Sequence, residues 1–153
     1  MSKKSVSTKR GAKSKAASTY LLDAQVGFML RQVIQRHATI FVGRMGEDLT
    51  MTQWAALAKL FELGPCSQNL LGRYTAMDAA TIKGVVERLV KRGLLDTSPD
   101  PEDGRRLVVA LTPEGTALTE RSIAVAHQIT KETLSPLTKD ERTLFLALLE
   151  RLK

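Results

Sequence analysis

Apolar side chains recur at intervals of three and four residues in several stretches of this chain. This is the spacing of helices that bury one face against a core. In residues 23–43 the stripe comprises Val26, Met29, Leu30, Val33, His37, Ile40 and Phe41. In residues 52–63 the expected inward positions are Trp54, Leu57, Leu60 and Phe61. Gly64 and Pro65 follow and predict the end of this second helix, because neither residue suits a helix interior.

A helix-turn-helix is predicted next. Ser67 is a candidate N-cap for a short helix over residues 68–74, and Asp78 is one for a longer helix that ends near Arg92. Gly93 then occupies the position that commonly ends a helix. The inward stripe of the longer helix is expected to comprise Ile82, Val85, Val86, Leu89 and Val90. Two helices at this separation are typical of DNA-binding proteins.

Strand-like residues replace the helical spacing at 94–97 and again at 107–111, which predicts a two-stranded hairpin. The tip between these strands is charged, contains Gly104 and ends in two arginines, Arg105 and Arg106. Such a tip is poor core material, and it suits contact with a polyanion. A hairpin directly behind a helix-turn-helix predicts a winged helix that holds DNA.

Further helices are predicted after the hairpin. Thr112 and Pro113 are a helix start with a proline at the first helical position, and Pro136 interrupts the helix that they begin. A capping box of Thr138 and Glu141 starts the last helix. The apolar side of that helix consists of Leu144, Phe145, Leu148, Leu149 and Leu152. A chain of 153 residues leaves little core to cover such stripes, so we predict a homodimer.

The predicted fold class is mainly α (α+β), with a winged helix-turn-helix over residues 50–115 and dimerisation helices over 20–45 and 120–153. The formal net charge is +7, but from Ala16 onward 17 basic residues face 16 acidic ones. The excess therefore belongs to a tail, residues 1–19, which is rich in Lys, Ser and Thr. This tail is either a disordered, solubilising extension or an arm that touches DNA phosphates.

Several classes of protein are disfavoured by what the sequence lacks. The longest apolar run, residues 144–149, is far shorter than the ~20 residues that span a bilayer, and no apolar signal core follows the basic N-terminus. A single cysteine, Cys66, cannot form an internal disulfide, which fits a reducing cytoplasm. His37, His127 and Cys66 are too scattered for a metal site, and no nucleophile–base pair or phosphate loop indicates an enzyme. We expect no cofactor, no metal and no membrane contact.

Three segments carry a family resemblance. Residues 67–73 are SQNLLGR, residues 75–95 are TAMDAATIKGVVERLVKRGLL, and residues 100–115 are DPEDGRRLVVALTPEG. Together they resemble the MarR family of bacterial transcriptional regulators, and within it the sequence is most similar to the branch that represses nicotinate catabolism. The resemblance covers residues 23–153. It implies a dimeric winged helix-turn-helix repressor that binds double-stranded DNA at a pseudo-palindromic operator and is released by a small aromatic acid such as a hydroxynicotinate.

The longer helix of the helix-turn-helix is the expected recognition helix. Thr81 can bond a base edge or pack its methyl group on thymine, Lys83 can reach guanine or phosphate, and Arg88 is expected at a phosphate. Ser67 opens the preceding helix, where another phosphate is expected. The DNA-binding residues predicted on these two helices are Ser67, Gln68, Ala80, Thr81, Lys83, Gly84 and Arg88. The alternative is an ordinary solvated face.

The resemblance also implies roles for the hairpin tip. Arg105 reaches into the minor groove, whose negative potential suits a planar cation, and Asp103 holds the Arg105 guanidinium from within the loop. Arg106 is either a further DNA contact or the exposed end of a strand. Gly104 stands where the family often has a basic residue. Residues 66–115 contain seven basic and seven acidic side chains, so the placement of the charges, and not their sum, must orient DNA.

An aromatic carboxylate needs a fixed cation, a hydrogen-bond donor and an apolar slot. Arg31 resembles the arginine that anchors carboxylates in some family members, and His37 on the same helix can bond a ring substituent. Met51 and Trp54 are expected to line the slot. Six residues place Arg31 and His37 about 240° apart around a helix, so they meet only if the partner subunit supplies one of them. The alternatives are a core histidine, a core tryptophan, and an Arg31 that pairs with a nearby carboxylate.

Two other functions are also considered from the sequence. A winged helix can bind protein and not DNA, although such a module needs neither Arg105 at the tip nor a base-accessible helix start. Cys66 stands before the short helix of the helix-turn-helix, and a helix N-terminus can lower the pKa of a thiol. Redox sensing through Cys66 is therefore an alternative, against the interpretation of Cys66 as a small, half-buried apolar residue.

Overall fold

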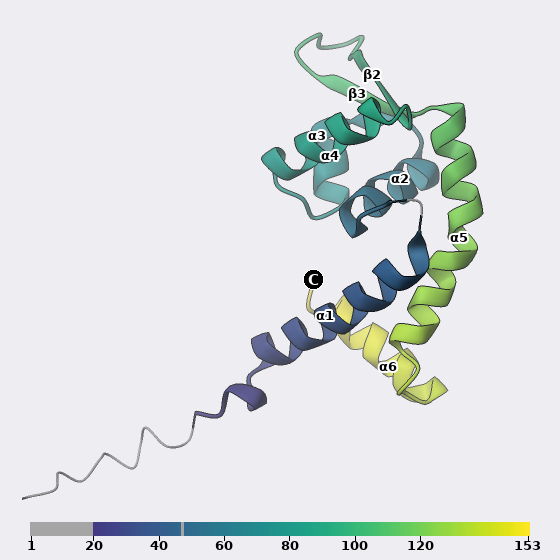
Figure 1. Cartoon of the computed structure of the whole chain (residues 1–153). Coiled ribbons are helices and arrows are strands. Elements are labelled where there is room, and N and C mark those ends of the chain that lie inside the picture. Colours follow the sequence, from purple (N-terminus) through teal and green to yellow (C-terminus); the bar gives the residue numbers. More distant parts are fainter. Residues whose placement is uncertain (1–19, 47) are drawn as a thin grey trace, which may run out of the picture. The chain divides into compact units, whose positions relative to one another are not determined.

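The computed structural model describes residues 20–46 and 48–153 (Figure 1). The chain divides into two units, residues 1–34 and 35–153, and the boundary falls within helix α1 (Val26–Met45). The described part of the first unit consists of a short 3₁₀-helix, Leu22–Ala24, and the first turns of α1. The tail predicted over residues 1–19 lies outside the described residues.

The second unit contains the end of α1 and all of the later elements. In chain order these are α2 (Met51–Leu63), β1 (Cys66–Ser67), α3 (Gln68–Tyr74), α4 (Ala79–Lys91), β2 (Leu95–Pro99), β3 (Leu107–Leu111), α5 (Pro113–Thr133) and α6 (Lys139–Glu150). Figure 1 shows α3 and α4 beside the β2–β3 hairpin, while α5 runs from the sheet past α2. The predicted fold class, helices with a small antiparallel wing, is confirmed.

Side-chain caps fix where the helices begin. Ser67, Asp78, Thr112 and Thr138 each accept a hydrogen bond from the backbone N–H three residues further on, as their positions predicted. Thr50 does the same for α2 and forms a capping box with Gln53. The caps place each turn of the helix-turn-helix at a defined residue, so α4, the expected recognition helix, starts at Ala79.

The sheet has three strands and not the two of the predicted hairpin. The order is β1-β3-β2, and both neighbours of β3 run antiparallel to it. Val109 in β3 is opposite Cys66 of β1 and Thr97 of β2, and it is fully buried. β1 escapes sequence analysis because two residues are too short to show an alternating pattern. Its pairing ties the start of α3 to the base of the wing.

The core of the second unit lies where α2, α3 and α4 meet the inner face of the sheet. Its largest fully buried side chains are Leu57, Leu60, Leu71, Ile82, Leu89, Leu95, Val85, Val109 and Thr119. Two expected inward positions are wrong, because Phe61 is 38% exposed and Val90 is 37% exposed. Each stands at the edge of its helix stripe, where a residue one position further round already faces outward.

Large apolar side chains of the predicted stripe remain uncovered on α6 and just beyond its end, while Phe145 and Leu149 are half-buried. Leu144 is 61% exposed, Leu148 45% and Leu152 76%. In the first unit, Tyr20, Leu21, Leu22 and Val26 are also exposed. Among the residues described, no helix combines the length and the apolar character needed to cross a membrane.

A tight junction joins the end of α4, the wing and the start of α5. The Thr112 backbone N–H donates to the Leu94 carbonyl at 3.2 Å, and its hydroxyl donates to the Gly93 carbonyl at 2.7 Å. The same hydroxyl accepts from the Gly115 N–H at 2.9 Å. Gly115 lies so close to this turn that a Cβ atom there would overlap the Leu94 carbonyl oxygen. Glycine is required at position 115 by close approach and not by its backbone angles.

We expect Gly115→Ala to lower the free energy of unfolding by more than about 2 kcal/mol, because backbone atoms must move to admit the methyl group. Urea unfolding monitored by circular dichroism measures the change. Gly43→Ala is the matched control. No atom lies within 4 Å of a Cβ at Gly43, so this variant should be as stable as the wild type or more stable, by up to about 1 kcal/mol. Equal stabilities for the two variants would contradict the close approach at Gly115.

Candidate nucleic-acid interface and ligand cavity

The recognition helix α4 is anchored by its buried stripe and its cap. Ile82, Val85 and Leu89 are buried, which fixes the rotation of the helix about its axis. The Asp78 carboxylate accepts from the Thr81 backbone N–H at 2.7 Å. This bond and a further one with the Thr81 side chain hold the pKa of Asp78 below its usual value. The carboxylate is therefore ionised at neutral pH and keeps the first turn of α4 closed.

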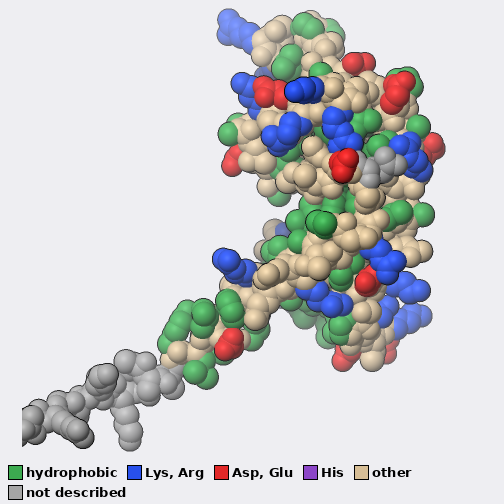
Figure 2. All heavy atoms as spheres, in the orientation of Figure 1, with side chains coloured by type: hydrophobic (Ala, Val, Ile, Leu, Met, Phe, Trp, Pro, Cys, Tyr) green, Lys and Arg blue, Asp and Glu red, His purple; other side chains and the backbone are tan. Residues whose placement is uncertain are grey.

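The predicted DNA contacts on α4 lie on its outer face. Ala80, Thr81, Lys83 and Arg88 are exposed, and Gly84 is half-buried. Lys83 pairs with Glu87 across one turn, with 3.8 Å between Nζ and the carboxylate oxygen. Figure 2 shows Lys and Arg side chains over this part of the second unit with acidic side chains among them. The pattern agrees with the balance of charge in the sequence.

The wing tip is held by Asp103, but not in the way the resemblance implies. The Asp103 carboxylate accepts from the Arg105 backbone N–H at 3.1 Å and pairs with Nε of Arg106 at 3.3 Å. The Arg106 N–H donates to the Asp103 carbonyl at 2.8 Å, and the Arg106 carbonyl accepts from the Asp100 N–H at 2.9 Å. This turn places the side chain of Arg106, three residues after Asp103, beside the Asp103 carboxylate, and not the side chain of Arg105, two residues after it. Asp103 therefore shapes the loop and steadies Arg106, while the Arg105 side chain is exposed.

The wing and the start of α3 share a hollow of about 130 Å³. Its lining is Ser67, Gln68, Asn69, Arg105, Arg106 and Leu107. Four of the residues predicted to bind DNA thus meet in one place, although almost forty positions separate them in sequence. Asn69 is an addition that the sequence did not indicate. The pairing of β1 with β3 explains why these residues lie together. It places Ser67 opposite Val108 in β3, the strand that directly follows the two arginines.

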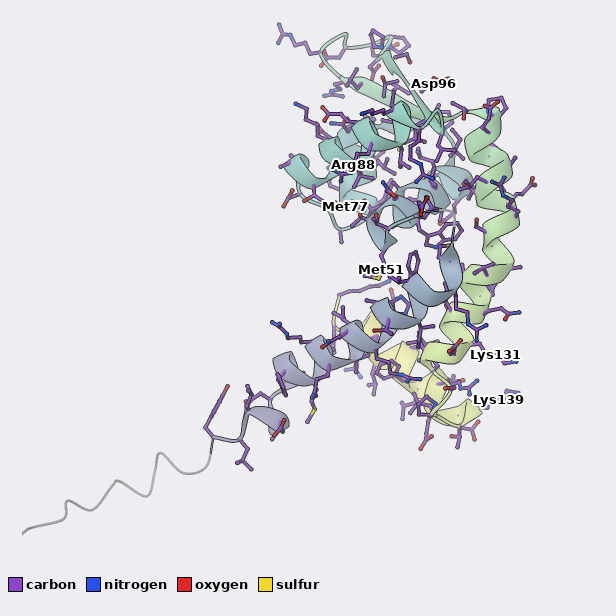
Figure 3. The ribbon with its side chains drawn as sticks, in the orientation of Figure 1. Met51, Met77, Arg88, Asp96, Lys131 and Lys139 are labelled. Atoms are coloured by element: carbon purple, nitrogen blue, oxygen red, sulfur yellow. The ribbon has the colours of Figure 1, made fainter. Side chains whose placement is uncertain are left out.

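A second cavity, of about 190 Å³, lies between the end of α1, α2 and α5. Three of the four residues predicted to bind a ligand, His37, Met51 and Trp54, line it. The remaining lining residues are Phe41, Met45, Ala126, Ile129 and Thr130. None of these was predicted to line the cavity, and those on α5 are recognised only once that helix is placed against the others. Figure 3 shows Met51 at the start of α2.

His37 has a hydrogen-bond partner as well as a place on this cavity. Its Nδ1 atom lies 2.8 Å from the Thr133 hydroxyl oxygen. This hydrogen bond orients the ring, and the other ring nitrogen, Nε2, takes no part in it. The interpretation as a hydrogen-bonded, half-buried histidine and the interpretation as a lining residue are therefore compatible. Arg31 belongs to the other unit and is exposed. Its role as a carboxylate anchor stays a prediction.

Comparison with known proteins supports this architecture. The sequence profile of the MarR family matches residues 49–107, from the loop before α2 to the first residue of β3. The HTH-type transcriptional repressor NicR of Pseudomonas putida is 42% identical over 134 residues, which cover 87% of this chain and 85% of that protein. The chain belongs to the MarR family.

Solved structures of MarR-type proteins have the same fold. A probable transcriptional regulator from Pseudomonas aeruginosa is 56% identical and superimposes with a TM-score of 0.85 over 87% of this chain and 100% of that one. BpsR of Bordetella bronchiseptica, whose DNA binding is regulated by 6-hydroxynicotinic acid, is 42% identical, with a TM-score of 0.79 over 84% of this chain and 98% of that one. The predicted family is confirmed, and these relatives are described as regulators of transcription and not as enzymes.

Cys66 of this MarR-family chain lies where its thiol is less acidic than usual. It lies in β1, half-buried and paired with the central strand. Burial raises the pKa of the Cys66 thiol, whereas a redox sensor needs a lowered one. The structure disfavours the redox alternative. Within the described part of the chain, no group of three or more His, Cys, Asp or Glu residues is suited to hold a metal ion.

We expect Cys66 in the folded protein to react with a disulfide reagent more slowly than the same thiol in the urea-unfolded chain at equal pH, because less thiolate is present. Absorbance of the released reagent anion measures both rates. A folded-state rate equal to or faster than the unfolded-state rate would restore the redox alternative.

Proposed function

We propose that this chain is a homodimeric, sequence-specific transcriptional repressor that leaves its operator when a small aromatic carboxylate, of the 6-hydroxynicotinate type, binds. The dimer is formed by helices from residues 20–45 and 120–153, and the winged helix-turn-helix of residues 50–115 meets the DNA. The recognition helix α4 enters the major groove, and the wing lies on the adjacent minor groove. Two subunits bind the two halves of a pseudo-palindromic site.

One observation carries the DNA-binding part of this proposal. Ser67 and Gln68 lie around a single hollow with Arg105 and Arg106. Two guanidinium groups beside a hydroxyl and an amide suit a phosphate oxygen, because arginine offers several donors to it. The backbone bonds of Asp103 preform this tip, so little ordering is required on binding. A phosphate seated there would orient α4 toward the neighbouring groove.

The homodimer is supported by the uncovered apolar side chains on α6 and just beyond its end. Leu144, Leu148 and Leu152 are all more than two-fifths exposed. Contiguous exposed apolar side chains of this kind favour a protein interface. A partner subunit can also cover the exposed apolar residues of the first unit.

The effector part rests on the cavity around His37, Met51 and Trp54. An apolar cavity of about 150 Å³ admits benzene, so a space of about 190 Å³ is large enough for one aromatic ring. His37 offers a polar atom for a ring substituent. The lining contains no arginine or lysine, so the carboxylate needs a cation from elsewhere, and Arg31 of the partner subunit is our candidate. NicR and BpsR, to which this chain is similar, favour a hydroxynicotinate.

Helix α2 connects the cavity with the recognition helix. Met51 and Trp54 face the ligand space from the first turns of α2, while Leu57 and Leu60 are buried in the core, where α2 packs against α4. Nη1 of Arg92 donates to the Asp48 carbonyl at 3.1 Å, which ties the end of α4 to the segment before α2. A ligand that shifts α2 therefore shifts α4, and its differential affinity for the two positions sets the degree of release.

We expect Arg105→Ala to weaken operator binding by about tenfold. The slope of log K against log salt should fall by about 0.9, because one cation close to the DNA phosphates is lost. Arg105→Lys is the matched control. It should restore the slope but only part of the affinity, since lysine lacks the planar fork that suits a narrow minor groove. Fluorescence anisotropy on a duplex that the wild type selects from a random library measures both. Unchanged binding by a folded Arg105→Ala protein would remove the wing from the interface.

We expect 6-hydroxynicotinate at 100 times its Kd to stabilise the wild type by ~2.7 kcal/mol and to release the selected duplex. In Arg31→Ala the Kd should rise at least tenfold, because the carboxylate loses a charged partner. The amide analogue, 6-hydroxynicotinamide, lacks that charge and should bind both proteins about equally weakly. Thermal shift and anisotropy measure the two effects. Equal affinity of wild type and Arg31→Ala for the acid would exclude Arg31 as the anchor.

A further inference from the structure

The recognition helix has a glycine in its interior, Gly84, although glycine disfavours the helical conformation. The Arg88 side chain folds back over it (Figure 3 labels Arg88 on α4). A Cβ atom on Gly84 would lie 3.3 Å from Nη1 and 3.7 Å from Nη2 of Arg88. Gly84 is half-buried on an otherwise exposed face. The absent side chain leaves room for the arginine head group.

The neighbouring charges single out Arg88 on this face. Lys83 is paired with Glu87, so part of its charge is already satisfied in the free protein. Over residues 20–46 and 48–153, the Arg88 guanidinium makes neither an ion pair nor a hydrogen bond. α4 carries one more exposed cation, Lys91, which lies nearer to the C-terminal end of the helix. Arg88 is therefore the unpaired cation of α4 that lies closer to its N-terminal end.

The position of the guanidinium favours a base over the backbone of DNA. Thr81, Gly84 and Arg88 are three and four residues apart and share one face of the helix. A side chain that folds toward the N-terminus of α4 points to the end of a recognition helix that meets base edges. An extended Arg88 would instead reach outward, toward phosphates. The planar guanidinium matches the N7 and O6 acceptors of guanine in the major groove.

We propose that Gly84 is a specificity-determining residue, because its missing side chain positions Arg88 to bind a guanine of the operator. Arg88 then reads a base, and is not only the phosphate contact that the sequence suggested. This inference rests on the proposed DNA-binding function and deepens it. A larger residue at position 84 should keep the helix and its charge but turn the guanidinium away from the base.

The test uses the full chain and a duplex that the wild type selects from a random library. Each guanine of that duplex is replaced in turn by 7-deazaguanine, which lacks the N7 acceptor. We expect the wild type to lose about tenfold in affinity at one guanine per half-site. Arg88→Ala and Gly84→Leu should each lose most of this discrimination, and Gly84→Ala should lose part of it. The variant with both Gly84→Leu and Arg88→Ala should bind as Arg88→Ala does.

The controls separate positioning from other effects. Leucine and alanine favour helix more than glycine, so thermal unfolding should show the position 84 variants to be folded. A uniform loss at all guanines in Arg88→Ala, with a reduced salt slope, would make Arg88 a phosphate contact and overturn the inference. So would a further loss from Gly84→Leu when Arg88 is absent, since leucine would then obstruct DNA directly. If the wild type selects no duplex, the proposed function fails as well.

Discussion

The hydrogen bonds of Thr112 are the constraint on which the arrangement of the DNA-binding elements depends. One side chain joins the carbonyl of Gly93, just past the recognition helix, to the N–H of Gly115 in α5. The backbone N–H of Thr112 donates to the Leu94 carbonyl at the base of the wing. The end of α4, the base of the wing and the start of α5 are thus joined within a single turn. Any shift of α5 is passed to α4 and the wing through bonds and not through loose packing.

The same junction links the cavity around His37, Met51 and Trp54 to the helix-turn-helix. Ile129 and Thr130 line the cavity on α5, and Trp54 lines it on α2. Both helices lead to α4, α5 through the Thr112 junction and α2 through the core and the Arg92–Asp48 bond. In the proposed function, a ligand in this cavity would displace α2 or α5, and α4 would move with them, because packed elements move as units.

Local sequence signals predicted the elements of this fold well. An N-cap such as Asp78 or a helix-ending glycine such as Gly93 acts within one turn, so both can be recognised without knowledge of tertiary structure. β1 was not predicted, because its two residues become a strand only through Val108 and Val109. The cavity was predicted on α1 and α2 but not on α5, where Ala126 and Ile129 look like ordinary core positions. The partner of Asp103 was misassigned, since a tight turn decides which of two adjacent arginines lies beside it.

The even balance of charge in the winged segment has a consequence for how such a protein works in a cell. Residues 66–115 hold as many acidic as basic side chains, and Glu87 already occupies Lys83. Affinity for arbitrary DNA comes mainly from unpaired cations. Because the charges balance within residues 66–115, in the proposed repressor this segment would separate the operator from the rest of the chromosome, and non-specific affinity would be left to the basic residues of the tail.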